Sequence, residues 1–233
     1  MHYTDPFLEI ALESSSSIFR GLNQKDKELL SERYILTNHK KGDMIITEGN
    51  MFRGFAFLAS GKVKVFKTGV GGREQILKLV KENGFIGYRS IFTDHPSPFS
   101  VAAVEPAAVI IFERSAILKV LRKNPEMGIR LMKLMAEEIN FINNRIVSLT
   151  QKHIRGRVAE SLLLLRDTCG VDADGRTIKV QLPREDIAHL SNMTTSNAIR
   201  TLSNLASERI IELHGRRITI INSSRLESIS EMG

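Results

Sequence analysis

The chain has 233 residues, 42% hydrophobic and 25% charged, which suits two packed domains and excludes a disordered chain. We expect a cytoplasmic protein without membrane contact, because there is no secretory signal at the amino terminus and no apolar run of membrane-spanning length. The single cysteine, Cys169, excludes an internal disulfide and a cysteine-ligated iron–sulfur cluster within one chain. The net charge of +7 favours a polyanionic partner but does not locate its binding site.

Residues 1–123 are predicted to form a β-barrel or jelly-roll domain. Short apolar segments of strand length are separated by glycines, and polar and apolar residues mostly alternate from Lys62 to Lys67. The stretch before residue 38 is predicted to be helical, with Leu29 and Leu30 on its apolar face. Many short strands joined by glycine turns are typical of this class of domain. The predicted strands are 44–47, 54–58, 62–67 and 74–80, with a hairpin tip at Gly69–Gly72.

Residues 124–149 are predicted to form one long helix. Asn124 suits the cap and Pro125 the first helical position. A first apolar stripe repeats as a heptad seam, and a second stripe contains Leu131, Leu134 and Phe141. One interpretation is a helix that packs only on its own domain. Two stripes favour a helix that packs on the β domain and also on a second copy, so we predict a homodimer. Its interface residues are Met132, Met135, Ile139, Ile142, Ile146 and Leu149.

Residues 150–233 are predicted to form a winged helix-turn-helix domain, which makes the fold class α+β. A helix over 155–166 and a short strand over 177–181 precede two helices. The first of these is Arg184–Leu190, and Asn192 tolerates the left-handed conformation that the following turn needs. Thr194 caps the second helix. Two β-branched segments, 210–213 and 218–221, then flank a glycine turn with two basic residues, as in the wing of this domain.

The second helix carries the pattern of a DNA-reading element. Ala198, Leu202 and Leu205 anchor one face, and the segment 194–206 contains no carboxylate. A helix in the major groove avoids acids near phosphates and offers short polar groups and arginine to base edges. The alternative is an ordinary polar surface helix. We expect base contacts from Arg200, Thr195, Ser196 and Ile199, and phosphate contacts from Thr194, Asn197, Arg184 and Arg216.

In this order of elements the chain resembles the CRP/FNR family of bacterial transcription regulators over nearly its whole length. The matching residues are Lys41-Gly42, Glu48-Gly49, Gly84-Phe85-Ile86-Gly87, Arg157-Val158-Ala159 and, without gaps, 184–205. The resemblance implies a homodimer on near-palindromic double-stranded DNA, contact with RNA polymerase, and a β-barrel that senses a small molecule, a metallocofactor or a gas. On the recognition helix Ser196 replaces the family's usual glutamate, whereas Arg200 keeps its arginine, so we expect a different operator.

The resemblance also places a candidate effector pocket, and this chain departs from the family there. Members that bind cyclic nucleotides carry a glutamate where Tyr88 stands and an arginine–serine pair where Ser97–Ser100 stand. We therefore expect an effector other than cyclic AMP, and its identity is open. The alternative is a barrel that binds no effector and acts as a dimer scaffold, with Tyr88 and Phe99 filling the pocket. The candidate pocket residues are Gly87, Tyr88, Arg89, Ser90, Phe99, Ser100, Ile142 and Asn143.

An enzyme is the remaining alternative class. A cupin-like metal enzyme needs a convergent cluster of histidines and a glutamate, and the six histidines show no metal-ligand spacing. The sequence contains no nucleophile motif, no P-loop and no dinucleotide-binding glycine pattern. We therefore expect neither catalysis nor a metal site.

Overall fold

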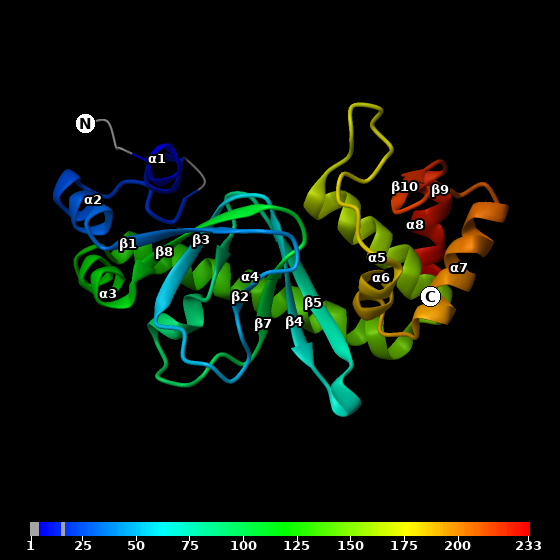
Figure 1. Cartoon of the computed structure of the whole chain (residues 1–233), viewed down its shortest axis with the longest axis horizontal. Helices are drawn as coiled ribbons and strands as arrows, with labels where there is room; N and C mark the ends of the chain where they lie inside the picture. The colour runs from blue at the N-terminus through cyan, green and yellow to red at the C-terminus, as the bar shows by residue number, and fades with distance from the viewer. Residues whose placement is uncertain (1–4, 15–16) are drawn as a thin grey trace. The chain divides into compact units, whose positions relative to one another are not determined.

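The computed structural model describes residues 5–14 and 17–233. These residues form two compact units (Figure 1). The first contains the described residues up to Val65 together with Val80–Ile139, and the second contains Phe66–Leu79 together with Asn140–Gly233. The outer part of one β-hairpin therefore clusters with the carboxy-terminal helices. None of the helices in the described ranges is long and apolar enough to cross a membrane.

The β domain consists of two four-stranded sheets of jelly-roll type rather than a closed barrel. The first sheet is antiparallel throughout, and β8 pairs with both β1 and β3 at its centre. In spatial order its strands are β1 (Tyr34–His39), β8 (Ala107–Glu113), β3 (Gly54–Ser60) and β6 (Phe85–Ile86). The second sheet contains β2 (Met44–Ile46), β7 (Ser100–Ala103), β4 (Lys62–Thr68) and β5 (Glu74–Lys81).

The four predicted strands are confirmed within a few residues as β2, β3, β4 and β5, and the tip between β4 and β5 contains the short helix η1 (Val70–Gly72). The predicted helix before residue 38 is correct for α2 (Gln24–Ser31) and wrong beyond it, because β1 occupies Tyr34–His39. Tyr34 pairs with Phe112 and Thr37 with Val109 across the sheet. These partners lie more than seventy positions away, and local pattern does not reveal them.

A cluster of aromatic rings fills the core of the first unit. Phe19 contacts Phe112 edge to face with 5.0 Å between ring centroids, and Phe55 stacks on Phe85 at 5.0 Å. Two helices pack against this cluster, α1 (Pro6–Glu13) and α3 (Arg114–Lys123), through buried leucine, alanine and isoleucine side chains. Burial of such side chains supplies most of the stabilisation of a domain of this size.

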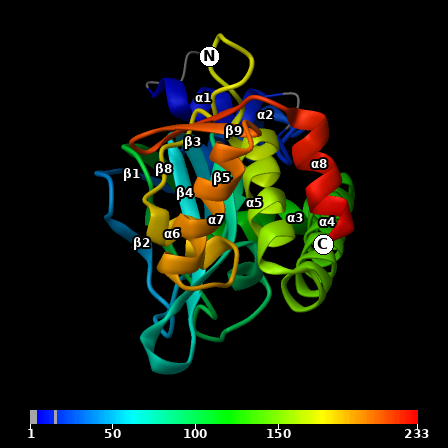
Figure 2. The same ribbon diagram turned by 90° about the vertical axis from the view of Figure 1, so that its right-hand side faces the viewer.

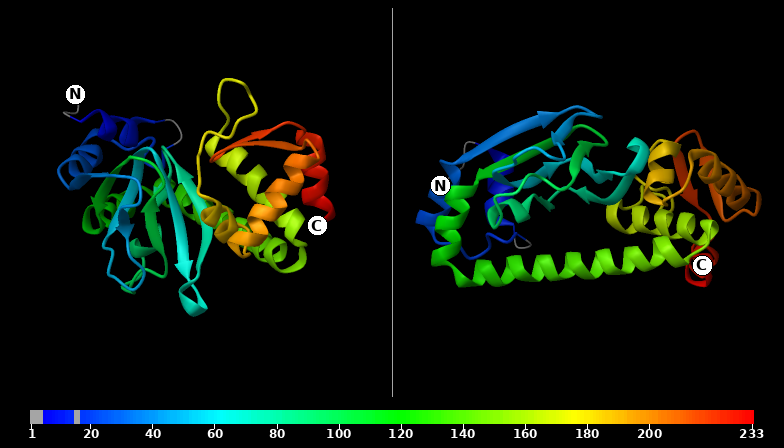
Figure 3. Two further views of the ribbon diagram at one scale, coloured as in Figure 1. Left: turned by 45° about the vertical axis from the view of Figure 1, so that its right-hand side comes forward. Right: turned by 90° about the horizontal axis from the view of Figure 1, so that it is seen from below.

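The long helix is confirmed as α4 (Pro125–Gln151), continuous in Figure 3. Its second apolar stripe packs inward, with Leu131 buried and Leu134 half-buried against the aromatic core. Its heptad seam is mostly exposed. The exposed fractions are 63% for Met132, 57% for Ile139, 43% for Ile142 and 55% for Ile146, whereas Met135 and Leu149 are half-buried.

The second unit is built on α5 (Ile154–Cys169), which is buried along one side through Val158, Leu162 and Leu165. Figure 2 shows α5 beside α8 (Ser223–Met232), a helix that the sequence analysis did not predict. The predicted strand 177–181 is wrong as a strand. Residues 177 and 178 form only isolated bridges to Thr219 and Val171.

Candidate DNA-binding site and effector pocket

The helix-turn-helix forms where the sequence predicts it. The first helix, α6 (Arg184–Leu190), has the predicted bounds, and Asn192 in the turn has a φ of +50°. Ala188 is fully buried, and its carbonyl accepts from the backbone N–H of Met193 at 3.0 Å. A small side chain at residue 188 therefore allows the second helix to cross close to the first.

The second helix, α7 (Thr195–Ser207), separates an anchoring face from an exposed face. The backbone N–H of Asn197 donates to the Thr194 hydroxyl at 3.3 Å, which confirms the predicted cap. The anchoring residues Ala198, Leu202 and Leu205 are fully buried. On the other side Thr194, Ser196 and Arg200 are exposed, Ile199 is 48% exposed, and Thr195 and Asn197 are half-buried.

The wing follows α7 as the predicted hairpin of β9 (Ile211–His214) and β10 (Arg217–Ile220). Its turn is Gly215-Arg216, where Gly215 has a φ of +58° that favours glycine. Arg216 is exposed at this tip, whereas Arg217 forms an ion pair with Asp172 at 2.7 Å. Arg216 is therefore the tip residue better placed to meet a phosphate.

Arg184 lies at the start of α6 and supports the wing. Its Nη2 donates to the Gly215 carbonyl at 2.6 Å, and burial lowers the pKa of its guanidinium below the ordinary value. The side chain is half-buried and thus partly committed to holding the tip in place. A phosphate contact from Arg184 would therefore use N–H groups of the guanidinium other than the one that donates to Gly215.

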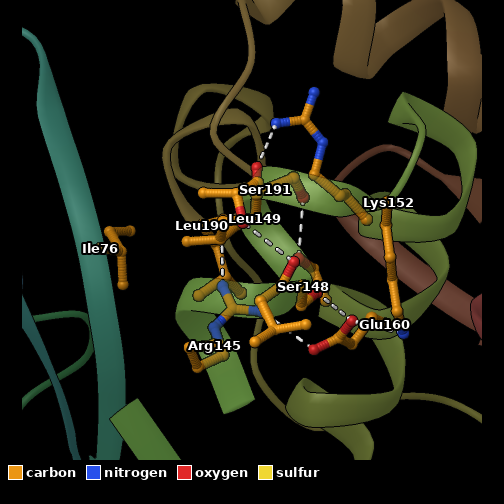
Figure 4. Close-up of polar contacts among 12 residues, drawn as sticks. Ile76, Arg145, Ser148, Leu149, Lys152, Glu160, Leu190 and Ser191 are labelled. Carbon is orange, nitrogen blue, oxygen red and sulfur yellow. Dashed lines mark hydrogen bonds and ion pairs between the residues drawn. The ribbon is translucent and has the colours of Figure 1, made fainter. Parts of the chain in front are cut away.

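A polar network that the sequence analysis missed joins α4, α5 and α6 within the second unit (Figure 4). Arg145 on α4 is buried, donates from Nη2 to the Leu190 carbonyl at 2.6 Å and lies 3.5 Å from Glu160. Glu160 also accepts from the Ser148 hydroxyl and pairs with Lys152 at 2.9 Å. Since Leu190 ends α6, Arg145 binds a carbonyl at the negative end of that helix.

The carboxyl of Glu160 stays ionised in this network. Burial by itself would raise the pKa, but the hydrogen bonds from Ser148 and Lys152 and the charges of Lys152 and Arg145 outweigh it and hold the pKa below the ordinary value. The sequence carried a signal for this network. Arg145 and Ser148 continue the inward stripe of Leu131, Leu134 and Phe141 at the same helical spacing, which places polar groups on a buried face.

Four of the candidate pocket residues meet in a hollow of the first unit, namely Gly87, Arg89, Ser90 and Phe99. The empty space of this hollow is about 340 Å³, and part of it is open solvent. Phe52 lies over Gly87, where an added Cβ would lie 2.5 Å from the Phe52 ring. Phe52 and Phe99 thus occupy the walls with aromatic side chains.

The other pocket candidates lie elsewhere. Tyr88 is buried in the aromatic core, and burial, the charge of Glu138 and a hydrogen bond to that carboxylate raise the pKa of its phenol. The Ser100 hydroxyl accepts from the Glu48 N–H at 3.0 Å. Ile142 and Asn143 are exposed on α4 and are not among the residues that line the hollow.

The polar side chains that line the hollow are Arg89, Ser90, Thr93, His95 and Ser97. Ser90 donates to the carbonyls of Gly54 and Gly87 at 2.6 and 2.8 Å, so its hydroxyl is engaged with backbone. Arg89 is exposed, and the segment 97–100 supplies no arginine. Charge-assisted hydrogen bonds are the strongest contacts that a protein offers a phosphate, and residues 97–100 offer none to a ligand in this hollow.

Comparison with known proteins gives matches along the chain. A model of the cyclic nucleotide-binding domain matches residues 36–124, and a model of the Crp-like helix-turn-helix domain matches residues 156–229. The sequence is 26% identical over 213 residues to the CRP-like cAMP-activated global transcriptional regulator of Mycobacterium tuberculosis, covering 91% of this chain and 95% of that protein. It is 25% identical over 189 residues to the global nitrogen regulator of a Nostoc species, covering 80% and 85%.

The fold is also found in solved structures. FixK2 from Bradyrhizobium japonicum superimposes with a TM-score of 0.75 at 21% identity, over 84% of this chain and 96% of that chain. The jelly-roll unit, the long helix and the winged helix-turn-helix, taken with these matches, define a DNA-binding transcription regulator. The chain belongs to the CRP/FNR family.

Proposed function

We propose that the protein is a homodimeric regulator that reads a near-palindromic operator with α7. The observation that carries this proposal is the exposed, carboxylate-free side of α7, where Arg200 stands opposite the buried anchors Ala198 and Leu202. A helix of this kind enters the major groove without bringing acids to the phosphates. We assign residues 1–123 to the sensor-like domain, 124–149 to the dimer helix and 150–233 to the DNA-binding domain.

The residues of this interface fall into two classes. Arg200 donates to a base edge, in the geometry that suits guanine O6 and N7, with Thr195 and Ser196 beside it. Ile199 is exposed enough to contact a thymine methyl. A second class fixes register without reading sequence and contains Thr194, Asn197, Arg184 and Arg216, the last at the tip of the wing.

Two arginine substitutions separate these classes. We expect Arg200→Ala to cost about 1–3 kcal/mol on the operator and to relax preference at one base pair in each half-site. Arg216→Ala should weaken binding to all DNA and flatten its salt dependence, because it removes a phosphate contact. Fluorescence anisotropy on operator and random duplexes measures both. Equal loss on the two duplexes for Arg200→Ala, with an unchanged consensus, would show that Arg200 contacts only phosphate.

The dimer is proposed to form through the exposed seam of α4. Met132, Ile139, Ile142 and Ile146 present apolar surface at helical spacing, and burying such side chains contributes about 1.5–3 kcal/mol each before association costs. Met135 and Leu149 complete the seam from half-buried positions. Two-fold symmetry of the protein then matches two half-sites of the DNA.

The effector is proposed to be something other than cyclic AMP. The Mycobacterium relative is described as cAMP-activated, but here the hollow holds Phe52 and Phe99, and the hydroxyls of Ser90 and Ser97 are engaged with backbone. The second candidate is a barrel that binds no effector and serves the dimer as a scaffold. The aromatic walls formed by Phe52 and Phe99 favour it, whereas Tyr88 lies in the core and does not fill the hollow.

The remaining roles follow from DNA binding. We propose that the protein works in the cytoplasm, where bacterial DNA lies, that it acts on transcription together with RNA polymerase, and that it catalyses no reaction. The Mycobacterium relative is described as a transcriptional regulator and the Nostoc relative as a nitrogen regulator, which supports a regulatory role.

A further inference from the structure

The β4–β5 hairpin meets the helix-turn-helix within the second unit. Gln75 at the start of β5 donates from Nε2 to the His189 carbonyl at 2.7 Å, and Arg73 donates to the side-chain oxygen of Asn192 in the turn. These bonds hold the beginning of β5 against the last turn of α6. They bring Glu74, which lies between them in sequence, to the face of α6 that carries Asp186 and His189.

Three side chains with metal-binding atoms converge there. One ligand atom each from Glu74, Asp186 and His189 lies within 4.8 Å of the other two. Asp186 and His189 are three positions apart, so they share one face of α6. Only 8% of Asp186 is exposed, and the side chains of His189 and Glu74 are 14% and 31% exposed.

One nitrogen atom of this group has no hydrogen-bond partner among the described residues. This atom is the Nδ1 of His189, which is buried. It lies 3.7 Å from the Glu74 carboxylate, beyond hydrogen-bond reach. A buried ring nitrogen without a partner costs stability, and so do two neighbouring carboxylates when one of them, Asp186, is buried. A divalent cation between them would remove both costs.

We propose that Glu74, Asp186 and His189 bind a first-row divalent transition metal, with Zn²⁺ the best suited. One imidazole nitrogen and two carboxylate oxygens are a ligand set for Zn²⁺, Mn²⁺ or Co²⁺, whereas Mg²⁺ and Ca²⁺ prefer oxygen alone. Ligands of a tetrahedral Zn²⁺ lie about 3.5 Å apart, so side-chain shifts of about 1 Å close the site. Carboxylates keep several lone pairs, which allows Glu74 and Asp186 to retain their other contacts.

Metal in this site would fasten the hairpin to the first helix of the DNA-binding motif. The hairpin is then joined to α6 through a metal as well as through Gln75. The sequence analysis expected no metal site because it looked for histidines close together in sequence. Here Asp186 and His189 are three positions apart on a helix, and Glu74 lies 112 positions before Asp186 (186 − 74).

The test titrates Co²⁺ and Zn²⁺ into the untagged, chelator-treated full-length protein. Visible absorption follows Co²⁺, and calorimetry follows Zn²⁺. We expect saturation at one equivalent per chain, with affinity at least tenfold weaker in His189→Gln and in Glu74→Gln. The matched controls are Glu185→Gln, an exposed carboxylate on the same helix, and His214→Ala, an exposed histidine in the wing. Both controls should bind as the unchanged protein does.

Two results would overturn the proposal. One is the absence of saturable Co²⁺ or Zn²⁺ binding to the folded protein. The other is equal metal affinity in His189→Gln and in the unchanged protein, which would mean that the metal ions bind only at other positions on the surface. Circular dichroism confirms that each variant is folded, and Glu74→Gln provides a second route because it changes the hairpin and leaves α6 intact. Metal binding is measured without DNA, so its failure would leave the assignment of α7 untouched.

Discussion

Arg145 and Glu160 share one network, yet their replacement should have unequal effects on stability. The Arg145 side chain is 8% exposed, and its Nε and Nη1 are buried without hydrogen-bond partners among the described residues. Arg145→Met loses the bond to the Leu190 carbonyl, a charge-assisted bond that contributes about 1.5–3 kcal/mol. It also removes Nε, a buried donor without a partner that costs about 1–3 kcal/mol, and it leaves Glu160 with Ser148 and Lys152 as partners. The two effects offset each other, so we expect a change of less than about 1 kcal/mol.

Glu160→Gln leaves the buried cation in place and removes its carboxylate. Breaking a buried ion pair from one side costs about 3–5 kcal/mol. Since the Glu160 side chain is 23% exposed, the lower end of that range applies, about 3 kcal/mol. Lys152 also loses its partner, but water compensates it because its side chain is 26% exposed.

Urea unfolding followed by circular dichroism measures both variants. The matched control is Glu208→Gln, which breaks the exposed pair with Arg155 at 2.5 Å and should change the free energy of unfolding little, because water screens an exposed ion pair. The reasoning is refuted if Arg145→Met lowers the free energy of unfolding more than Glu160→Gln does. That order would mean that the bond from Arg145 to the end of α6 outweighs the cost of burying its unsatisfied Nε.

Three further predictions follow from the described residues. Glu160→Gln should also change how stability depends on pH. Because the pKa of Glu160 is lowered on folding, its carboxylate adds stability above the ordinary glutamate value of 4.5, and this stability is lost as the pH falls through the folded pKa. Below pH 4.5 the free energy of unfolding of the variant should therefore fall less steeply than that of the unchanged protein, and an equal slope would contradict the assignment. The double variant Ile139→Glu, Ile142→Glu should be monomeric by light scattering with weak operator binding, whereas a full dimer would disprove the seam. Calorimetric titration with cyclic AMP should give no heat of binding at micromolar concentrations, and micromolar affinity would contradict the proposal that the effector is not cyclic AMP.

The sequence predicted the helix-turn-helix well because the turn and the helix cap each depend on residues close together in the chain. Asn192 adopts the left-handed conformation in the turn, and Thr194 caps α7. Each depends on the chemistry of one residue and its immediate neighbours, and each appears where predicted. The heptad seam of α4 was visible for the same reason, since its period lies within one helix.

Features that depend on distant partners were not predictable. Strand β1 depends on its pairing with β8, and the network of Arg145 depends on α5 and α6 being brought to the end of α4. Tyr88 was assigned to the pocket on the strength of resemblance, but it lies in the core and faces Glu138. A side chain at the edge of a pocket can turn either way, and packing on the other side of the sheet decides the direction.

The most direct test of the central claim is selection of bound duplexes from a random DNA library by the purified protein. The account predicts enrichment of a near-palindromic consensus whose half-sites are about one helical turn apart, with a guanine in each half-site that depends on Arg200. Selection by Arg200→Ala should keep the half-site spacing and lose preference at that base pair. Enrichment of no sequence, or of a single unrepeated site, would contradict a dimer that reads DNA with α7.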